Sequence, residues 1–230
     1  MIRKIREELF CFSTKERAES NQRFFKTGHG EYGEGDMFIG LTVPDTRKIA
    51  KKYSQASDID LKELLGSKIH EERLCALFIL VEKFKKAQEK KKDIAAFYLD
   101  NISRVNNWDL VDLSADKILG NYLLDKDKAM LYQLATSKNL WERRIAIIST
   151  FAFIRNNQFE DTLRIAEILL DDKQDLIHKA VGWMLREVGK KNQLVEEEFL
   201  QKHYQAMPRT MLRYAIERFE EEKRKSYLRK

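Results

Sequence analysis

The sequence predicts an all-α fold in which helices stack in pairs as a helical-repeat solenoid. Three observations predict it. The 230 residues include only two prolines and nine glycines, so few positions interrupt a helix. Apolar residues recur at spacings of three and four along most of the chain, and no sustained alternation typical of a strand occurs. Similar segments, Asn106–Trp108 and Asn139–Trp141, open two consecutive long helices 33 residues apart.

Proline positions and apolar stripes indicate where the helices lie. Pro44 and Pro208 each stand where a helix would begin, because a residue in the first turn needs no free N–H. In the middle of the chain, apolar stripes run from Leu74 to Phe84, from Ile147 to Ile154 and from Ile177 to Val188. The predicted helices are 3–10, 14–27, 44–54, 59–65, 69–86, 91–101, 106–122, 127–136, 139–155, 159–170, 175–189, 194–204 and 209–225.

One glycine-rich stretch, residues 28–36, separates the second and third predicted helices. It lacks the lysine and the Ser/Thr of a phosphate-binding loop, and no strand precedes it. Its three carboxylates would repel a phosphate. We therefore expect a flexible loop between helices.

The repeated segments also predict the architecture. Helix pairs with a period of roughly 33 to 40 residues fit a HEAT-like solenoid, an α-α superhelix whose inner helices line a concave face. The length suits one sizeable domain, so we expect residues 1–230 to form a single HEAT-like domain.

Composition favours an acidic partner. The net charge is +6 and the pI is about 9.1, which points first to nucleic acid and second to an anionic membrane. No apolar run reaches the roughly 18 residues of a membrane span, and no signal segment opens the chain. We expect a cytoplasmic monomer.

Metal and cofactor sites are not expected. Cys11 and Cys75 are the only cysteines, too few for a disulfide framework or a four-cysteine zinc site. The four histidines are scattered without ligand spacing.

Three charged or aromatic residues break the helical pattern. Asp112 and Arg144 each fall on the apolar face of their helix, where an ionised group is costly unless it is paired or used. Trp183 lies about 100° off its apolar stripe, between Lys179 and Arg186.

These residues are spaced by about one repeat. Equivalent helices of neighbouring repeats stack side by side, so Trp108, Asp112, Arg144 and Trp183 could converge on the concave face. Two indoles, a carboxylate and a guanidinium would suit a cationic substrate flanked by phosphate. The alternative is a buried Asp112–Arg144 salt bridge with both tryptophans as core residues.

Four segments resemble the AlkD-type DNA alkylation-repair glycosylases. They are Phe38–Pro44, Val105–Asp112, Trp141–Ile147 and Lys179–Glu187, and the resemblance spans about residues 20 to 190. It implies a HEAT-like fold with a basic concave groove for duplex DNA, and excision of cationic N3- and N7-alkylpurines in base-excision repair.

The resemblance also assigns roles. It implies that Trp108 and Trp183 pack on the lesion's sugar, that Asp112 is the catalytic carboxylate, and that Arg144 holds phosphate. We further expect Arg143, Lys179, Arg186 and Phe24 to contact DNA. Two alternatives remain at the level of function: a non-catalytic module that binds DNA structures, and a protein-interaction scaffold.

Two departures from the family concern the range of lesions. Phe24 stands where the family carries a tyrosine, although Tyr32 could take that place. Asn107 stands where some members carry a second tryptophan. On the same helix, Asp109 should face away from the site, because it lies about 100° from Trp108.

Overall fold

The computed structural model of the protein describes residues 1–229. In this part of the chain, the only pairing of β type is an isolated parallel bridge between Met37 and Ile69. The all-α helical-repeat class predicted from the sequence is confirmed. The chain divides into two compact units, the N-terminal unit (Met1–Ser114) and the C-terminal unit (Ala115–Lys230). That the two form a single domain stays a prediction.

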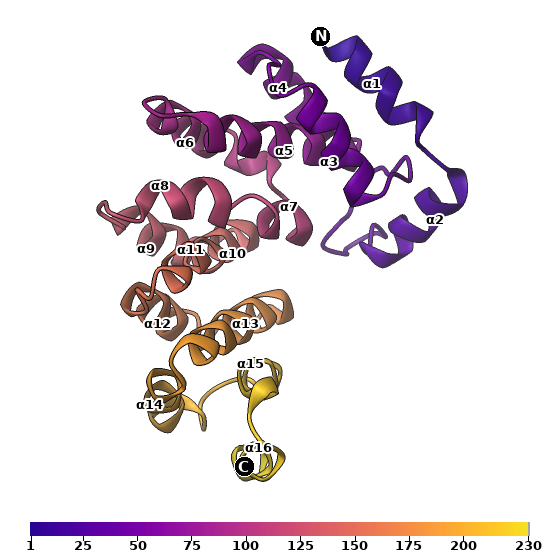
Figure 1. The fold of residues 1–230 in the computed structure, drawn as a ribbon. Helices are drawn as coiled ribbons and strands as arrows, with labels where there is room; N and C mark the ends of the chain where they lie inside the picture. Colours follow the sequence, from indigo (N-terminus) through magenta and orange to yellow (C-terminus); the bar gives the residue numbers. More distant parts are fainter. Residues whose placement is uncertain (230) are drawn as a thin grey trace. The chain divides into compact units, whose positions relative to one another are not determined.

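The N-terminal unit is organised around its longest helix, α5 (His70–Lys86), which packs against α3 and α4 (Figure 1). The predicted stripe from Leu74 to Phe84 is buried in it. The remaining helices of the unit are α1 (Ile2–Cys11), α2 (Lys15–Phe24), α3 (Val43–Lys52), α4 (Asp58–Leu65), α6 (Lys91–Asp100), the 3₁₀ turn η1 (Ile102–Arg104) and α7 (Trp108–Asp112).

Side-chain caps explain where two of these helices begin. Thr42 accepts a hydrogen bond from the Asp45 N–H at 3.2 Å, and Pro44 follows in the first turn of α3. Ser57 and Asp60 form a reciprocal capping box at the start of α4. The predicted ranges 44–54 and 59–65 agree with these helices to within two residues.

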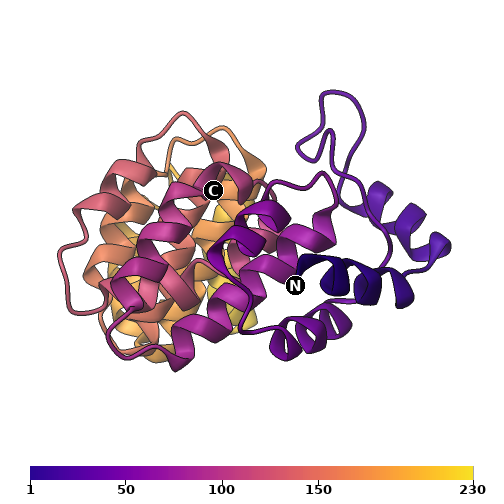
Figure 2. The ribbon, with the colours of Figure 1, turned by 90° about the horizontal axis from the view of Figure 1, so that it is seen from above.

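The glycine-rich stretch forms a loop between α2 and α3, as predicted (Figure 2). Its own carboxylates tie it together. Glu34 accepts a hydrogen bond from the Gly30 N–H at 2.9 Å and contacts His29 Nδ1 at 2.8 Å. Glu31 accepts a hydrogen bond from the Gly28 N–H at 2.9 Å. These carboxylates are therefore engaged within the loop.

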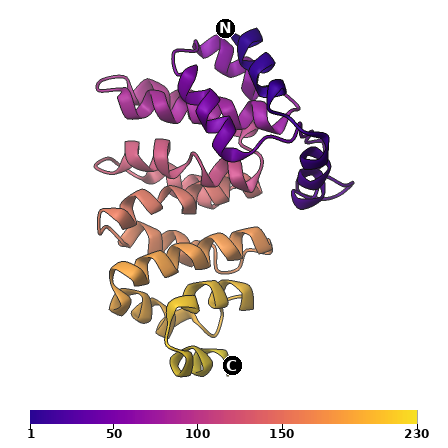
Figure 3. The ribbon, with the colours of Figure 1, turned by 45° about the vertical axis from the view of Figure 1, so that its right-hand side comes forward.

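The C-terminal unit is organised around α13 (Asp175–Lys191), which packs against α10, α14 and α15 (Figure 3). Gly182 makes the approach of α15 possible, because a Cβ there would collide with the Met211 carbonyl oxygen. The other elements are the π-helical η2 (Asp116–Gly120), α8 (Asn121–Leu123), α9 (Ala129–Ala135), α10 (Leu140–Ser149), α11 (Phe151–Arg155), α12 (Glu160–Ile168), α14 (Gln193–His203), α15 (Arg209–Ala215), η3 (Ile216–Arg218) and α16 (Glu221–Leu228).

Three of the long helices predicted as continuous are divided into shorter helices in the structure. The range 106–122 divides into α7, η2 and α8, and 139–155 divides at Thr150 into α10 and α11. Hydroxyl groups compete for the helix carbonyls at two breaks. Ser114 Oγ donates to Leu110 O at 2.5 Å, and Thr150 Oγ1 donates to Ile147 O at 2.7 Å. The range 209–225 also divides, since η3 separates α15 from α16.

Candidate functional site

The N-terminal unit contains a cavity of about 440 Å³ that is mostly aromatic and apolar. Its walls come from α2, the segment before α3, α5 and α7, so all of them belong to one unit. The lining residues are Arg17, Asn21, Phe24, Phe25, Phe38, Leu41, Thr42, Val43, His70, Glu71, Leu74, Trp108, Asp109, Asp112 and Leu113.

A stack of aromatic rings lines this cavity. The Trp108 indole stacks on Phe25, with centroids 5.1 Å apart and planes 13° apart. Phe24 meets Trp108 edge to face at 5.9 Å, and its side chain is 65% exposed. Of the two candidates for the family's tyrosine position, Phe24 therefore lines the cavity. Tyr32 lies in the loop, with its hydroxyl 3.5 Å from Phe24 O.

Carboxylates line the cavity beside the rings, together with Arg17 and His70. Asp112, the last residue of α7, is half-buried and lines the cavity with Trp108. Asp109 was expected to face away from the site, but it is also one of the residues that line the cavity. The 100° step from Trp108 carries Asp109 toward α5, where its Oδ2 lies 2.8 Å from His70 Nε2.

His70 lies at the centre of a buried network that no pattern in the sequence indicates. Its Nδ1 lies 3.2 Å from Asp36 Oδ2, and the other oxygen of Asp36 accepts from Arg73 Nη2 at 2.7 Å. Asn107 Nδ2 also donates to Asp36, at 3.1 Å. Asp109 completes the network, and all five residues are less than a tenth exposed.

The network shifts the pKa values of two members. Burial lowers the pKa of His70, but the charge and hydrogen bond of Asp109, with the hydrogen bond of Asp36, outweigh it, so the pKa lies above its ordinary value. Burial raises the pKa of Asp36, but the hydrogen bond from His70 and the charge of Arg73 outweigh it and lower that pKa. The network therefore favours the charged form of both groups.

Glu71 fixes the segment that leads into α3. Its buried carboxylate accepts hydrogen bonds from three successive backbone N–H groups, at 3.1 Å from Ile39, 2.8 Å from Gly40 and 3.3 Å from Leu41. Gly40 has φ +85 and leaves no room for a Cβ against Thr14. The segment Phe38–Pro44, singled out by the resemblance, is thus a scaffold for the cavity wall.

The other predicted residues belong to the C-terminal unit. Arg144 is 5% exposed, and its guanidinium donates to the Leu176 carbonyl. Arg143 Nε donates to Asp172 Oδ2 at 2.5 Å, and its Nη1 donates to Ser137 O at 2.9 Å. Both arginines therefore brace the start of α13 and the loop before it.

Trp183 is half-buried on α13, where its Nε1 donates to Glu187 Oε1 at 3.1 Å. Its helical neighbours are ion-paired, Lys179 with Asp175 at 2.7 Å and Arg186 with Glu217. The structure thus gathers Trp108, Asp112 and Phe24 in one unit and the remaining predicted residues in the other. The predicted convergence of the two sets stays a prediction.

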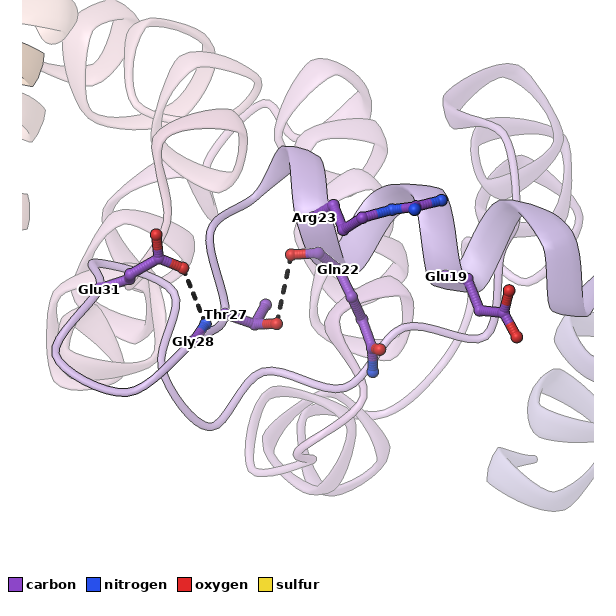
Figure 4. A pocket seen from close by; sticks show the side chains of 6 residues that line it. All are labelled: Glu19, Gln22, Arg23, Thr27, Gly28 and Glu31. Carbon is purple, nitrogen blue, oxygen red and sulfur yellow. Dashed lines mark hydrogen bonds between the residues drawn. The ribbon is translucent and has the colours of Figure 1, made fainter.

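A second hollow is more open and lies on α2 and the glycine-rich loop (Figure 4). Thr27 and Gly28 in its wall form hydrogen bonds with Gln22 O and the Glu31 carboxylate. No aromatic ring lines it. The cavity at Trp108 is the candidate site because several aromatic rings and carboxylates meet in its wall.

Two further features of residues 1–229 bear on the function. No group of three or more His, Cys, Asp or Glu residues within residues 1–229 is arranged to hold a metal ion. In the same part of the chain, none of the helices has the length and apolar character needed to cross a membrane.

Two comparisons with known proteins lead to the same description. A family model described as "DNA alkylation repair enzyme" matches residues 5–219. The chain is similar to a solved structure, "Predicted DNA alkylation repair enzyme from Enterococcus faecalis", with a TM-score of 0.69, covering 91% of this chain and 97% of that one. At 16% identity, this likeness shows the fold alone. No curated protein matches the chain.

Proposed function

The chain belongs to the DNA alkylation repair enzyme family, and we propose that it is a DNA glycosylase that releases cationic N3- and N7-alkylpurines from duplex DNA. One observation carries the proposal. Asp112 and Trp108 line the same aromatic cavity. An electron-rich ring beside a carboxylate favours a positively charged sugar over a neutral one.

The chemistry follows from the charge of the substrate. An N3- or N7-alkylated purine is already cationic, so it can leave without a general acid. As the C1′–N bond breaks, the sugar becomes oxocarbenium-like, and both electrons of the bond go to the departing base. In the proposal, Asp112 stabilises that charge and orients the water that attacks C1′.

We propose further roles for the aromatic residues. Trp108 would pack on the deoxyribose, and Phe24 would offer its exposed ring beside it. Trp183 would present its indole face to the same kind of cationic sugar. Because these contacts go to the sugar, the lesion could remain stacked in the duplex. The enzyme would act as a cytoplasmic monomer without a metal or cofactor.

Cations of the C-terminal unit would bind phosphate. Lys179 and Arg186 already pair with carboxylates, and Lys179 and its partner Asp175 are both substantially exposed. Exposed ion pairs contribute only about 0–1 kcal/mol, so DNA phosphate could replace such carboxylates. Arg143 pairs at a more buried position, which makes exchange there more costly.

A product assay tests the proposal against a binding module. Purified protein is incubated with duplexes that carry either 7-methylguanine or uracil, and the free bases are separated by chromatography. The proposal expects release of 7-methylguanine and none of the neutral base. Tight duplex binding without release of either base would instead support a non-catalytic DNA-binding module.

Binding to duplex DNA should be electrostatic and nearly independent of sequence, because the chain is basic, with a pI of about 9.1. Each neutralised phosphate should contribute a slope of about −0.9 to the logarithm of affinity against the logarithm of salt concentration. Fluorescence anisotropy across a salt series measures the slope. An affinity that hardly changes with salt would exclude this mode of binding.

Replacing Arg144 with alanine should affect the fold as well as DNA binding. The guanidinium is buried and donates to the Leu176 carbonyl, so its loss should lower the free energy of unfolding by about 1.5–3 kcal/mol. Thermal unfolding of the variant measures the change. An unchanged melting temperature together with weaker binding to lesion-bearing duplex would mean that Arg144 serves DNA alone.

A further inference from the structure

The helix that carries Trp108 and Asp112 is only five residues long. A helix this short is not stable by itself, so contacts with its neighbours must fix its position. Two side chains at its start provide them. Asn107 caps the helix by accepting a hydrogen bond from the Trp108 N–H at 2.8 Å, and its Nδ2 donates to Asp36 at 3.1 Å. The Asp109 carboxylate contacts His70 at 2.8 Å.

Both contacts lead to the same imidazole. Asp109 meets His70 at Nε2, while Asn107 donates to Asp36, which meets His70 at Nδ1. His70 therefore joins α5 to the start of α7 by two routes, one direct and one through the segment before α3. The two routes enclose the backbone that presents Trp108.

The imidazole also supports the rings behind Trp108. The centroid of the His70 ring lies 4.5 Å from that of Phe38, on which it stacks, and 5.1 Å from that of Phe25. Phe25 in turn stacks on the Trp108 indole at 5.1 Å. A change at His70 would therefore reach Trp108 through ring packing as well as through hydrogen bonds.

The charges of the network balance only when His70 is protonated. The charged groups that face it are Asp109 from α7, Asp36 from the segment before α3, and Arg73 from α5. Phe25 and Phe38 contribute rings without charge, and the neighbouring Glu71 carboxylate binds backbone N–H groups. Loss of the imidazolium proton would leave a net negative charge among groups that are almost fully buried, which is unfavourable.

We propose that His70 is a positioning residue of the candidate site, which clamps the start of α7 and thereby places Trp108 and Asp112 for catalysis. Its effect on rate rests on the proposed function, whereas its effect on Trp108 does not. Since the pKa of His70 is raised, the clamp is complete below about pH 6.5 and weakens as pH rises through that higher pKa. The rate of base release should decline over the same interval.

The test follows Trp108 directly in the full chain. In ¹⁵N-labelled protein, the indole N–H signal of Trp108 is identified by its absence from Trp108→Phe. It is then recorded from about pH 6 to about pH 9, with the His70 ring signals. We expect both signals to titrate with one midpoint, and the Trp108 titration to vanish in His70→Gln. The single-turnover rate of His70→Gln should fall about tenfold and lose its decline at high pH.

His203→Gln is the matched control. His203 also contacts a phenylalanine ring, with its centroid 4.6 Å from that of Phe199, and its Nε2 lies 3.9 Å from a carboxylate oxygen of Glu167, yet it belongs to the other unit. Its replacement should leave the Trp108 signal, the rate and the pH profile unchanged.

The outcomes separate the two proposals. If the wild-type protein releases no base, the glycosylase assignment fails. The titration of the Trp108 signal then still tests whether His70 positions Trp108. If His70→Gln does not fold, the titration of the unaltered protein decides it. A Trp108 indole N–H signal that does not change while the His70 ring titrates would overturn the proposal. A His70→Gln variant that only melts earlier, with the wild-type rate and pH profile, would overturn it as well.

Discussion

Asp112→Asn is expected to lower the single-turnover rate of base release by about 10²-fold or more, roughly 2.7 kcal/mol of barrier. Asparagine keeps the shape of the side chain and its hydrogen-bonding capacity but removes the negative charge. A carboxylate that stabilises an oxocarbenium-like sugar acts through that charge, so the loss should appear in the rate and not in the affinity. Rapid-quench kinetics with excess enzyme on a 7-methylguanine duplex measure it.

The control for this variant must be chosen with the structure in view. Asp109 is unsuitable, because its carboxylate is buried against His70. Asp100 ends α6 in the same unit, is exposed and does not line the cavity. Asp100→Asn should retain the wild-type rate. A wild-type rate for Asp112→Asn would refute the proposed mechanism and turn attention to a binding scaffold or to a catalytic group elsewhere.

Glu71→Ala is expected to lower the free energy of unfolding by about 3 kcal/mol or more. The substitution leaves three backbone N–H groups, those of residues 39–41, without their carboxylate acceptor in a mostly buried position. Each buried donor that loses its partner costs about 1–3 kcal/mol. Denaturant unfolding followed by circular dichroism measures the change.

Two further variants sharpen that measurement. Glu71→Gln retains one acceptor oxygen and should be destabilised less than Glu71→Ala. Glu89 is exposed in the turn before α6, so Glu89→Ala should change the stability by no more than about 0.5 kcal/mol. Equal stabilities for Glu71→Ala and Glu89→Ala would contradict the role assigned to Glu71.

The fold was predictable where local patterns agree with packing. The stripe from Leu74 to Phe84 predicts α5 because apolar residues at helical spacing have to be buried on one side. The breaks at Ser114 and Thr150 were not predictable in the same way. A hydroxyl that competes for a helix carbonyl leaves the apolar pattern unchanged, so a pattern cannot reveal it.

The candidate site was predictable only in part. Trp108, Asp112 and Phe24 could be named because the first two belong to segments that resemble the family and the third takes a family position. His70 carried no such signal. Its partners Asp36 and Asp109 lie 34 and 39 residues away along the chain, and only tertiary packing brings the three together. Asp109 is likewise buried because α5 packs against it. The angle between Asp109 and Trp108 around their own helix cannot reveal that contact.

The most direct test of the central claim is a time course of the wild-type protein, in excess, on a duplex with a single 7-methylguanine. The proposed function predicts release of free 7-methylguanine in a single exponential phase. That release should be far faster than the spontaneous loss from the same duplex in buffer. Release at the spontaneous rate, from a folded protein that binds the duplex, would contradict the claim that this chain is a glycosylase for cationic alkylpurines.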